Sequence, residues 1–278
     1  MSAAQPASGT VSGRPSRTPA ASVLAPIARR TAQFGLGIAV VGTVWQVVTA
    51  ADLLPAYILP APRAVLAALH KNAALITTEA FATLSASLIG LFLGTVIGVV
   101  LAILLAYLPP LNRALMPLVI VLSTAPLIAV IPVLVVALGN GPAPRIIIAA
   151  MAATLLTAIY VRRGLDDTDT EGEELLATLD ASPWQRLRIL QFYAMLPYLF
   201  AALRVSVSTC VIQTIVAEWI TGTSGLGYLV QIAGASNRPE LMWAAVIVAI
   251  FLTLALLAIL SVVEAVVMPW SASIKEAM

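Results

Sequence analysis

Six long apolar runs divide this sequence, and each approaches the length that crosses a membrane as a helix. The hydrocarbon core of a bilayer is about 30 Å thick, so a spanning helix needs about 20 mostly apolar residues. Sixty per cent of the 278 residues are hydrophobic and 10% are charged, which is too apolar for a soluble domain. The sequence therefore predicts an all-α polytopic membrane protein with six transmembrane helices, at residues 34–50, 81–108, 115–138, 146–160, 198–220 and 242–268.

Lys and Arg are divided unequally between the two sides of these spans. Loops on the cytoplasmic side of a membrane carry the excess of basic residues. With the N-terminus inside, eleven basic residues are cytoplasmic and four are outside, so we expect both termini on the cytoplasmic side of the membrane. The cytoplasmic set is Arg14, Arg17, Arg29, Arg30, Arg113, Arg162, Arg163, Arg186, Arg188, Arg204 and Lys275; the outer set is Arg63, Lys71, Arg145 and Arg238. No basic cluster or aromatic platform indicates nucleic acid as a partner.

The N-terminal residues are rich in Ala, Ser, Pro, Thr and Arg and lack an apolar period. Such a composition buries too little apolar surface to order itself. We expect residues 1–30 to be a disordered cytoplasmic tail and residues 31–278 to be the membrane domain. Pro62 begins a predicted short helix at the outer surface, because proline is favoured at the first helical position.

Glycines and prolines mark two of the predicted spans. Gly90, Gly94 and Gly98 recur every fourth residue, which leaves one helix face without side chains for close helix contact. This face fits a seam inside one subunit or a seam between two subunits. The third predicted span contains Pro117, Pro126 and Pro132, which kink or break a helix. Breaks in a membrane helix persist where protein or a watery cavity satisfies the freed carbonyls, so this span is a candidate pathway lining.

Ionisable groups at membrane depth indicate function by default. Glu218 lies near the outer end of the fifth predicted span, with Gln213 and Thr214 one turn earlier. Two interpretations stay open for Glu218: a pathway or gate residue, or an internal hydrogen bond or interfacial anchor. Candidate pathway residues are Pro126, Pro132, Gln213, Thr214 and Glu218. Gly222, Gly225 and Gly227 are predicted to form an outer loop.

The charged stretch between the fourth and fifth spans is the element expected to meet a soluble partner. Seven of the thirteen acidic residues lie between Asp166 and Asp180, and a helix is predicted over 170–179. Ser182, Pro183 and Gln185 form the pattern of an N-cap, a first-turn proline and a capping-box Gln, which predicts a second helix. The apolar side chains expected to fill a groove on a partner are Leu175, Leu176, Leu179, Trp184 and Leu187.

This stretch resembles the EAA loop of permease subunits of bacterial ABC importers. Glu174 takes the family's Glu position, and Leu175 and Leu176 stand where the family usually has two alanines. The segments that match the family pattern are Ala181-Ser182-Pro183-Trp184-Gln185 and Leu196-Pro197-Tyr198, with Arg204 downstream. Trp45-Gln46, Leu59-Pro60, Pro62 and the stretch from Ser224 to Leu229 extend the resemblance to the nitrate, sulfonate and taurine branch.

Two positions depart from that pattern. Asp180 replaces the family's glycine at a turn where a left-handed backbone is expected, and Asp adopts that conformation at some cost. Phe192-Tyr193 replaces the family's first Leu-Pro pair. Both changes fall in the element that faces the partner, so they leave open a divergence toward a particular ATPase or a paralogous permease.

The resemblance implies a type I ABC importer permease fold with an EAA coupling loop over about residues 161–197. Its implied partners are two cytoplasmic ATPase subunits, a second permease subunit (identical or paralogous), an extracytoplasmic binding protein and membrane lipid. ATPase-coupling residues would be Glu174, Leu175, Leu176, Asp180, Ala181, Ser182, Trp184, Gln185 and Pro197. The implied cargo is a small solute: nitrate, a sulfonate, taurine, another small organic acid or a vitamin precursor.

No chemistry of its own is expected from this chain. The sequence has no GxxxxGK[ST] phosphate loop, no Cys/His metal spacing and no nucleophile elbow, so we expect neither catalytic residues, nor a metal, nor a cofactor. ATP would be bound by the partner subunits. Two other interpretations remain: a secondary transporter working as one polypeptide, which often has internal repeats and broken helices, and a membrane scaffold protein.

Overall fold

The computed structural model describes residues 21–269, without the side chains of residues 21–34 and 38. Over these residues the chain is helical with no strand. The elements are α1 (Ala21–Ala50), α2 (Pro62–Lys71), α3 (Ala73–Tyr107), α4 (Pro109–Thr124), the 3-10 helix η1 (Leu127–Val130), α5 (Ile131–Leu138), α6 (Ala143–Asp166), α7 (Thr170–Thr178), α8 (Pro183–Arg186), the π-helix η2 (Leu187–Gln191), α9 (Phe192–Thr221), α10 (Leu226–Ala235) and α11 (Pro239–Val267).

The chain divides into two units, Met1–Leu54 and Pro55–Met278. The first unit contains α1, which begins at Ala21, inside the range predicted to be a disordered tail. Residues 1–20 of that predicted tail lie outside the described residues. The hydroxyls of Thr43 and Thr49 donate hydrogen bonds to the carbonyls of Ala39 and Trp45, at 2.7 and 3.0 Å. Such bonds to the preceding turn satisfy hydroxyl groups in an apolar helix.

Four helices of the second unit are long and apolar enough to cross a membrane: α3, α6, α9 (continuous with α8 and η2) and α11. They contain the second, fourth, fifth and sixth predicted spans. The fourth span was predicted from only 15 residues, yet α6 has 24. The helix extends beyond the predicted span at both ends, by Ala143–Arg145 at its start and by Val161–Asp166, which includes Arg162, Arg163 and Asp166, at its end. Half of its most apolar stretch is buried, the largest share of the four. It is therefore the central helix of the unit.

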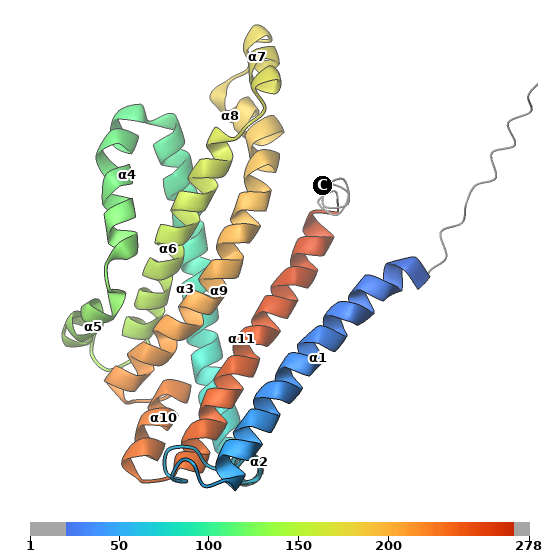
Figure 1. The fold of residues 1–278 in the computed structure, drawn as a ribbon. Coiled ribbons are helices and arrows are strands. Elements are labelled where there is room, and N and C mark those ends of the chain that lie inside the picture. Colours follow the sequence, from blue (N-terminus) through green and yellow to red (C-terminus); the bar gives the residue numbers. More distant parts are fainter. Residues whose placement is uncertain (1–20, 270–278) are drawn as a thin grey trace, which may run out of the picture. The chain divides into compact units, whose positions relative to one another are not determined.

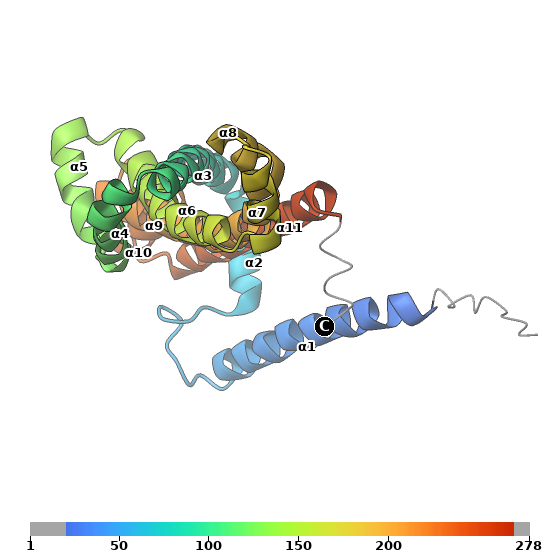
Figure 2. The ribbon, with the colours of Figure 1, turned by 90° about the horizontal axis from the view of Figure 1, so that it is seen from above.

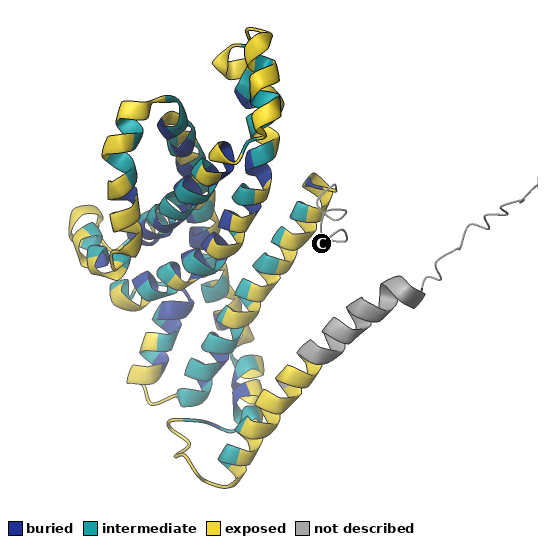
Figure 3. Cartoon of the chain, turned by 45° about the horizontal axis from the view of Figure 1, so that its top comes forward, coloured by how far each residue is buried: buried dark blue, intermediate teal, exposed yellow. Residues whose placement is uncertain are grey.

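The packing of α6 against α3 depends on the three regularly spaced glycines. A Cβ on Gly94 would lie 2.3 Å from the carbonyl oxygen of Ala150, and one on Gly98 would lie 2.7 Å from the Cβ of Thr157. Any larger residue at these positions would force the two helices apart. The glycine face is thus the seam inside one subunit, one of the two alternatives that the sequence left open. Figures 1 and 2 show α3, α6 and α9 side by side, and the buried residues gather between them (Figure 3).

The third predicted span is broken. Instead of one helix over 115–138, α4 ends at Thr124, and the segment Leu127–Leu138 continues at an angle of 92° to it. The helix breaks at Pro126 because proline has no backbone N–H to donate and its ring disfavours a helical conformation at the residue before it. Pro132 lies in the first turn of α5, where it is tolerated, and Pro117 lies inside α4. Helix α4 and the segment Leu127–Leu138 form either one broken span or a re-entrant loop, so by length and composition the described residues contain four spans, or five if this bent pair crosses the membrane.

The end of the unit away from α7 and α8 contains two short helices, α2 and α10 (Figure 1). Helix α2 begins at Pro62 as predicted. Helix α10 was not predicted: the stretch Gly222 to Gly227 was interpreted as loop, but Gly227 lies in the first turn of α10 and packs against the carbonyl of Ile215. Glycine at this position has the same role as in the α3–α6 seam, because it permits close helix contact.

Candidate functional site

The first candidate site is the projecting pair α7 and α8, here called the knob (Thr170–Arg186), at one end of the second unit (Figure 1). Both helices have side-chain caps. Asp169 accepts a hydrogen bond from the backbone N–H of Gly172 at 3.2 Å. Ser182 and Gln185 form the predicted reciprocal capping box, with bonds of 3.3 and 2.7 Å. The caps satisfy backbone donors that helix starts leave unpaired, so the knob is locally well defined.

The turn between the two helices has the geometry of a Schellman motif. The N–H of Ala181 bonds to the carbonyl of Leu176 at 2.9 Å, and the N–H of Asp180 bonds to that of Ala177 at 3.1 Å. Asp180 occupies the left-handed position with φ of +53°, as the sequence predicted. Glycine is the usual residue there because it has no Cβ to clash. The departure from the family pattern therefore changes the strain of this turn but not its path.

The knob exposes large apolar side chains. Leu175, Leu179 and Trp184 are 60%, 69% and 68% exposed, and most of the knob has the yellow colour of exposed residues in Figure 3. Glu174, Ser182 and Gln185 are also exposed, while Leu176 and Ala181 are half-buried. Leu187 is a correction to the predicted contact set, since it is buried in a core cluster with Val161, Leu165 and Met195. It lies on the inner side of η2 and holds the knob to the bundle.

The knob is also tied to the bundle by polar contacts that the sequence did not reveal. The hydroxyl of Tyr107, the last residue of α3, lies 2.6 Å from Oε1 of Gln191 and 3.1 Å from the carbonyl of Pro183. The amide of Gln191 donates to Glu173 on α7 at 2.9 Å. Pro197, the last predicted coupling residue, is exposed inside α9, in its second turn after the π-helix. Distorted helix turns of this kind are frequent at functional sites.

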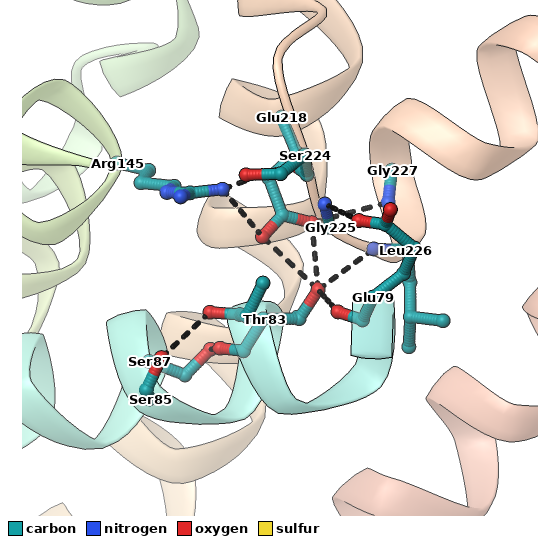
Figure 4. A network of polar contacts seen from close by, with 11 residues as sticks. Glu79, Thr83, Ser85, Ser87, Arg145, Glu218, Ser224, Gly225, Leu226 and Gly227 are labelled. Atoms are coloured by element: carbon teal, nitrogen blue, oxygen red, sulfur yellow. Dashed lines mark hydrogen bonds and ion pairs between the residues drawn. The ribbon is translucent and has the colours of Figure 1, made fainter. Parts of the chain in front are cut away.

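A second candidate site lies at the opposite end of the unit: the buried carboxylate network, made of Glu79, Thr83, Arg145, Glu218 and the backbone of 224–227 (Figure 4). The Glu218 carboxylate accepts hydrogen bonds from Thr83, at 2.8 and 3.0 Å, and from the N–H of Gly227 at 3.1 Å. Its side chain is fully buried and lies 3.5 Å from the guanidinium of Arg145. Burying a carboxylate is costly unless it is paired and hydrogen-bonded, and here it is both.

The network also fixes the start of α10. Glu79 accepts the N–H of Gly225, and Thr83 accepts the N–H of Leu226 at 2.8 Å. Arg145 donates to the carbonyl of Ser224 at 2.9 Å. Three successive backbone donors at a helix N-terminus are thus satisfied by side chains from α3 and α9, which also suits the positive end of the helix dipole. These contacts are the ones expected if Glu218 makes internal hydrogen bonds, which is the second of the two interpretations given above.

Arg145 was counted in the outer basic set, but its burial was not predicted: it lies in the first turn of α6 and is 7% exposed. Its position next to a long apolar run was the one available signal. Glu79 and Thr83, one turn apart on α3, were also missed because isolated polar residues in an apolar helix commonly satisfy their own backbone. Each acts here through a partner more than 130 positions away.

The remaining candidate pathway residues do not form one group. Pro126 and Gln213 line the same pocket of about 250 Å³ at the break between α4 and η1, together with Ser123 and Thr209. Thr214 is fully buried, and its hydroxyl has no hydrogen-bond partner among the described residues. Pro132 is exposed on α5 and Glu218 belongs to the network. Only Pro126 and Gln213 are thus brought together.

Comparison with known proteins gives a consistent assignment. Residues 94–271 match the family described as binding-protein-dependent transport system inner membrane component. A probable ABC transporter permease protein of Haemophilus influenzae is 31% identical over 77% of this chain and 87% of its own length. A riboflavin transport system permease protein of Chloroflexus aurantiacus is 32% identical over 82% and 86%.

Solved structures agree on the fold. An inward-facing methionine ABC transporter chain superimposes with a TM-score of 0.56 at 24% identity, covering 68% of this chain and 96% of its own. A chain of an amino acid ABC transporter gives 0.59 at 17% identity, covering 70% and 95%. These identities support the fold alone. The family match and the relatives above 30% identity go further: the chain belongs to the inner-membrane components of binding-protein-dependent transport systems, as a permease subunit of an ABC importer.

Proposed function

We propose that the knob is the site through which a cytoplasmic ATPase drives this permease. The observation that carries the proposal is the exposed apolar group Leu175, Leu179 and Trp184 on a capped, well-defined helix pair. Large apolar side chains gathered on an otherwise charged projection are typical of a protein contact. An aromatic anchor at the centre of such a contact commonly carries a disproportionate share of its binding energy.

The proposed assembly contains two ATPase subunits, a second permease subunit and an extracytoplasmic binding protein. The knob end would face the cytoplasm, with both termini on that side, because Arg113, Arg162, Arg163, Arg186 and Arg188 lie near it. ATPase closure would move the knobs of the two permease subunits together. The pathway would then open alternately to the two sides of the membrane.

The proposed cargo is a small organic solute with hydrogen-bonding groups. The pocket at the break between α4 and η1 offers the side chains of Ser123, Thr209 and Gln213 among apolar residues, and none of its lining residues is charged. Relatives are named for transport of riboflavin, formylaminopyrimidine, taurine and aliphatic sulfonates. Of these, the riboflavin and formylaminopyrimidine permeases are the more similar in sequence, at 32% and 27% identity against 24% and 23%. A heterocyclic vitamin or vitamin precursor is therefore the cargo we propose.

Uptake of labelled riboflavin, a pyrimidine precursor and taurine into vesicles containing the whole importer tests this choice of cargo. Transport of taurine alone would contradict it.

The coupling role is tested with a tagged permease, its ATPase and Trp184→Ala. Truncating a buried interface aromatic costs about 2 kcal/mol or more, which is about 30-fold in affinity. We expect ATPase recovery to fall accordingly, with the bundle still folded, because Trp184 is 68% exposed in this chain. Tyr57→Ala is the matched control, since Tyr57 is an aromatic of 70% exposure in the segment between α1 and α2. Full ATPase recovery and full ATP-dependent uptake with Trp184→Ala would refute the coupling role.

A further inference from the structure

Helix α3 contacts both candidate sites. Its last residue, Tyr107, bonds to Pro183 of the knob, and Thr83 and Glu79 near its first turns belong to the buried carboxylate network. With 35 residues and a rise of 1.5 Å per residue, α3 is about 52 Å long. It contains no proline, and its glycines are locked against α6. No feature that commonly kinks a helix is therefore left free in it.

Tyr107 contacts α8 directly and α7 through Gln191. Gln191 stands at the end of η2 and receives the Tyr107 hydroxyl on its carbonyl oxygen, while its amide nitrogen bonds to Glu173 on α7. The same hydroxyl is within 3.1 Å of the carbonyl of Pro183, the first residue of α8. One hydroxyl of α3 thus lies at the meeting point of α7, α8 and η2. A displacement of the knob that preserves these bonds must move the end of α3 with it.

We propose that Tyr107 is a positioning residue for coupling: through Gln191 and Glu173 it fastens the knob to α3, and α3 carries movement of the knob to the buried carboxylate network at its other end. This inference rests on the proposed binding of an ATPase to the knob. It assigns a role to three residues, Tyr107, Gln191 and Glu173, outside the exposed surface that the ATPase would cover.

The knob does not need Tyr107 in order to fold. Its helices are closed by their own caps and by the Schellman turn, and Leu187 anchors it in the core. Removal of the Tyr107 hydroxyl is therefore expected to leave ATPase binding intact and to weaken the link to α3. A merely structural bond would instead change the melting temperature or the ATPase recovery and leave the ratio of transport to hydrolysis unchanged.

The first arm of the experiment uses Tyr107→Phe in the complete importer. We expect normal ATPase recovery and a fall of about five-fold in solute transported per ATP hydrolysed, as for the loss of one hydrogen bond. Tyr160→Phe is the matched control, because Tyr160 lies on α6 near the same end and its hydroxyl makes no hydrogen bond within residues 21–269. Loss of the ATPase with Tyr107→Phe would overturn the positioning role, as would an unchanged transport ratio.

The second arm exchanges the two polar groups of the link. Gln191→Glu alone places a second carboxylate next to that of Glu173. The two charges repel each other, so we expect the amount of solute transported per ATP hydrolysed to fall. Combining Gln191→Glu with Glu173→Gln restores a carboxylate that accepts from Tyr107 and from the amide at position 173. We expect the double variant to regain most of the transport ratio. A double variant no better than the single one would contradict the proposed link.

The third arm measures the far end of α3. Thr223 is exposed just before the network, so Thr223→Cys reports its state to a membrane-impermeant maleimide, while Cys210 is buried. We expect labelling to change when ATP is added, and the change to disappear in combination with Tyr107→Phe. Persistence of the ATP-dependent change would overturn transmission along α3. These results are separable from the ATPase site itself: if Trp184→Ala retains the ATPase, the proposed coupling surface is wrong, whatever Tyr107→Phe does.

Discussion

The two ends of the second unit fix their short helices in different ways. At the knob, short-range caps hold the backbone and large apolar side chains stay exposed. At the buried carboxylate network, Arg145 and Glu218 are buried, Glu79 is half-buried, and all three bond to the start of α10. The first arrangement leaves a surface for a partner. In the second, the polar groups bond to one another and to the start of α10, so its contacts join α3, α6, α9 and α10.

This contrast predicts different costs of substitution at the two ends. A buried ion pair that loses one member leaves an uncompensated charge, whereas an exposed side chain that is truncated changes little in the isolated chain. Substitutions at the network are therefore expected to act on folding stability. Substitutions on the exposed side of the knob are expected to act on assembly.

The largest expected effect is that of Arg145→Met. It leaves the Glu218 carboxylate buried without its cation, which costs about 3 to 5 kcal/mol of stability. The measurement is denaturant unfolding in detergent, with Arg188→Met as the exposed control on η2. The double variant Arg145→Met plus Glu218→Gln is expected to recover part of the loss, because the buried charge is then gone. Equal stability of Arg145→Met and wild type would show that the ion pair does not hold this end.

Next in size is Leu187→Ala, which distinguishes the exposed side of the knob from the buried residue that anchors it to the bundle. Leu187 is 8% exposed and packs against Val161, Leu165 and Met195, so truncation is expected to cost about 2 to 4 kcal/mol. Leu179→Ala, at 69% exposure, is the matched control and is expected to change stability by less than about 0.5 kcal/mol while weakening ATPase binding. If both substitutions lower the melting temperature equally, the assignment of inner and outer faces is wrong.

A smaller loss is expected for Gly225→Ala. Gly225 has φ of +103°, and a Cβ there would lie 2.0 Å from the Glu218 carboxyl carbon. Strain of this kind costs about 1 to 3 kcal/mol. Gly141→Ala is the control, since a Cβ at Gly141 meets no atom within 4 Å. Thermal melting of the purified chain decides between the two, and an unchanged melting temperature for Gly225→Ala would mean that the turn yields.

How far the sequence predicted this molecule depends on the range of the contacts. The capping box of Ser182 and Gln185 and the left-handed Asp180 were predicted because each contact joins residues within a few positions. The glycine face of α3 was recognised, but its partner on α6 was not, since spacing alone does not choose between an internal and an external seam. Pro126 indicated a break, yet neither the 92° bend nor its direction follows from one proline.

The contacts that were missed are long in sequence. Arg145 meets a carboxylate 73 positions away, and Tyr107 meets an amide 84 positions away. A buried basic residue at a helix start counts in the charge rule in the same way as an exposed loop residue, so the count gave no sign that Arg145 is buried. Leu187 was assigned to the partner surface because its apolar side chain follows Trp184 in the charged stretch, and the residues it packs against, such as Val161 and Leu165, are distant in sequence.

The smallest expected effect is that of Asp180→Gly, which puts at this turn the glycine that the family pattern has there. Asp180 holds a left-handed conformation that costs a residue with a Cβ about 1 kcal/mol and costs glycine little. The substitution removes this strain, although it also frees the unfolded chain, so the net gain in stability is expected to be below about 1 kcal/mol. Because the Schellman bonds of Ala181 and Asp180 are backbone bonds, they survive the change, and the exposed positions of Leu179 and Trp184 are preserved. ATPase recovery on the tagged permease is therefore expected to be equal or higher, in contrast to its fall with Trp184→Ala. Asp180→Ala is the sharper control: it keeps the Cβ strain and removes only the carboxylate. If Asp180→Gly and Asp180→Ala both release the ATPase, the carboxylate itself makes the contact, and this end of the chain, like the other, depends on a charged group.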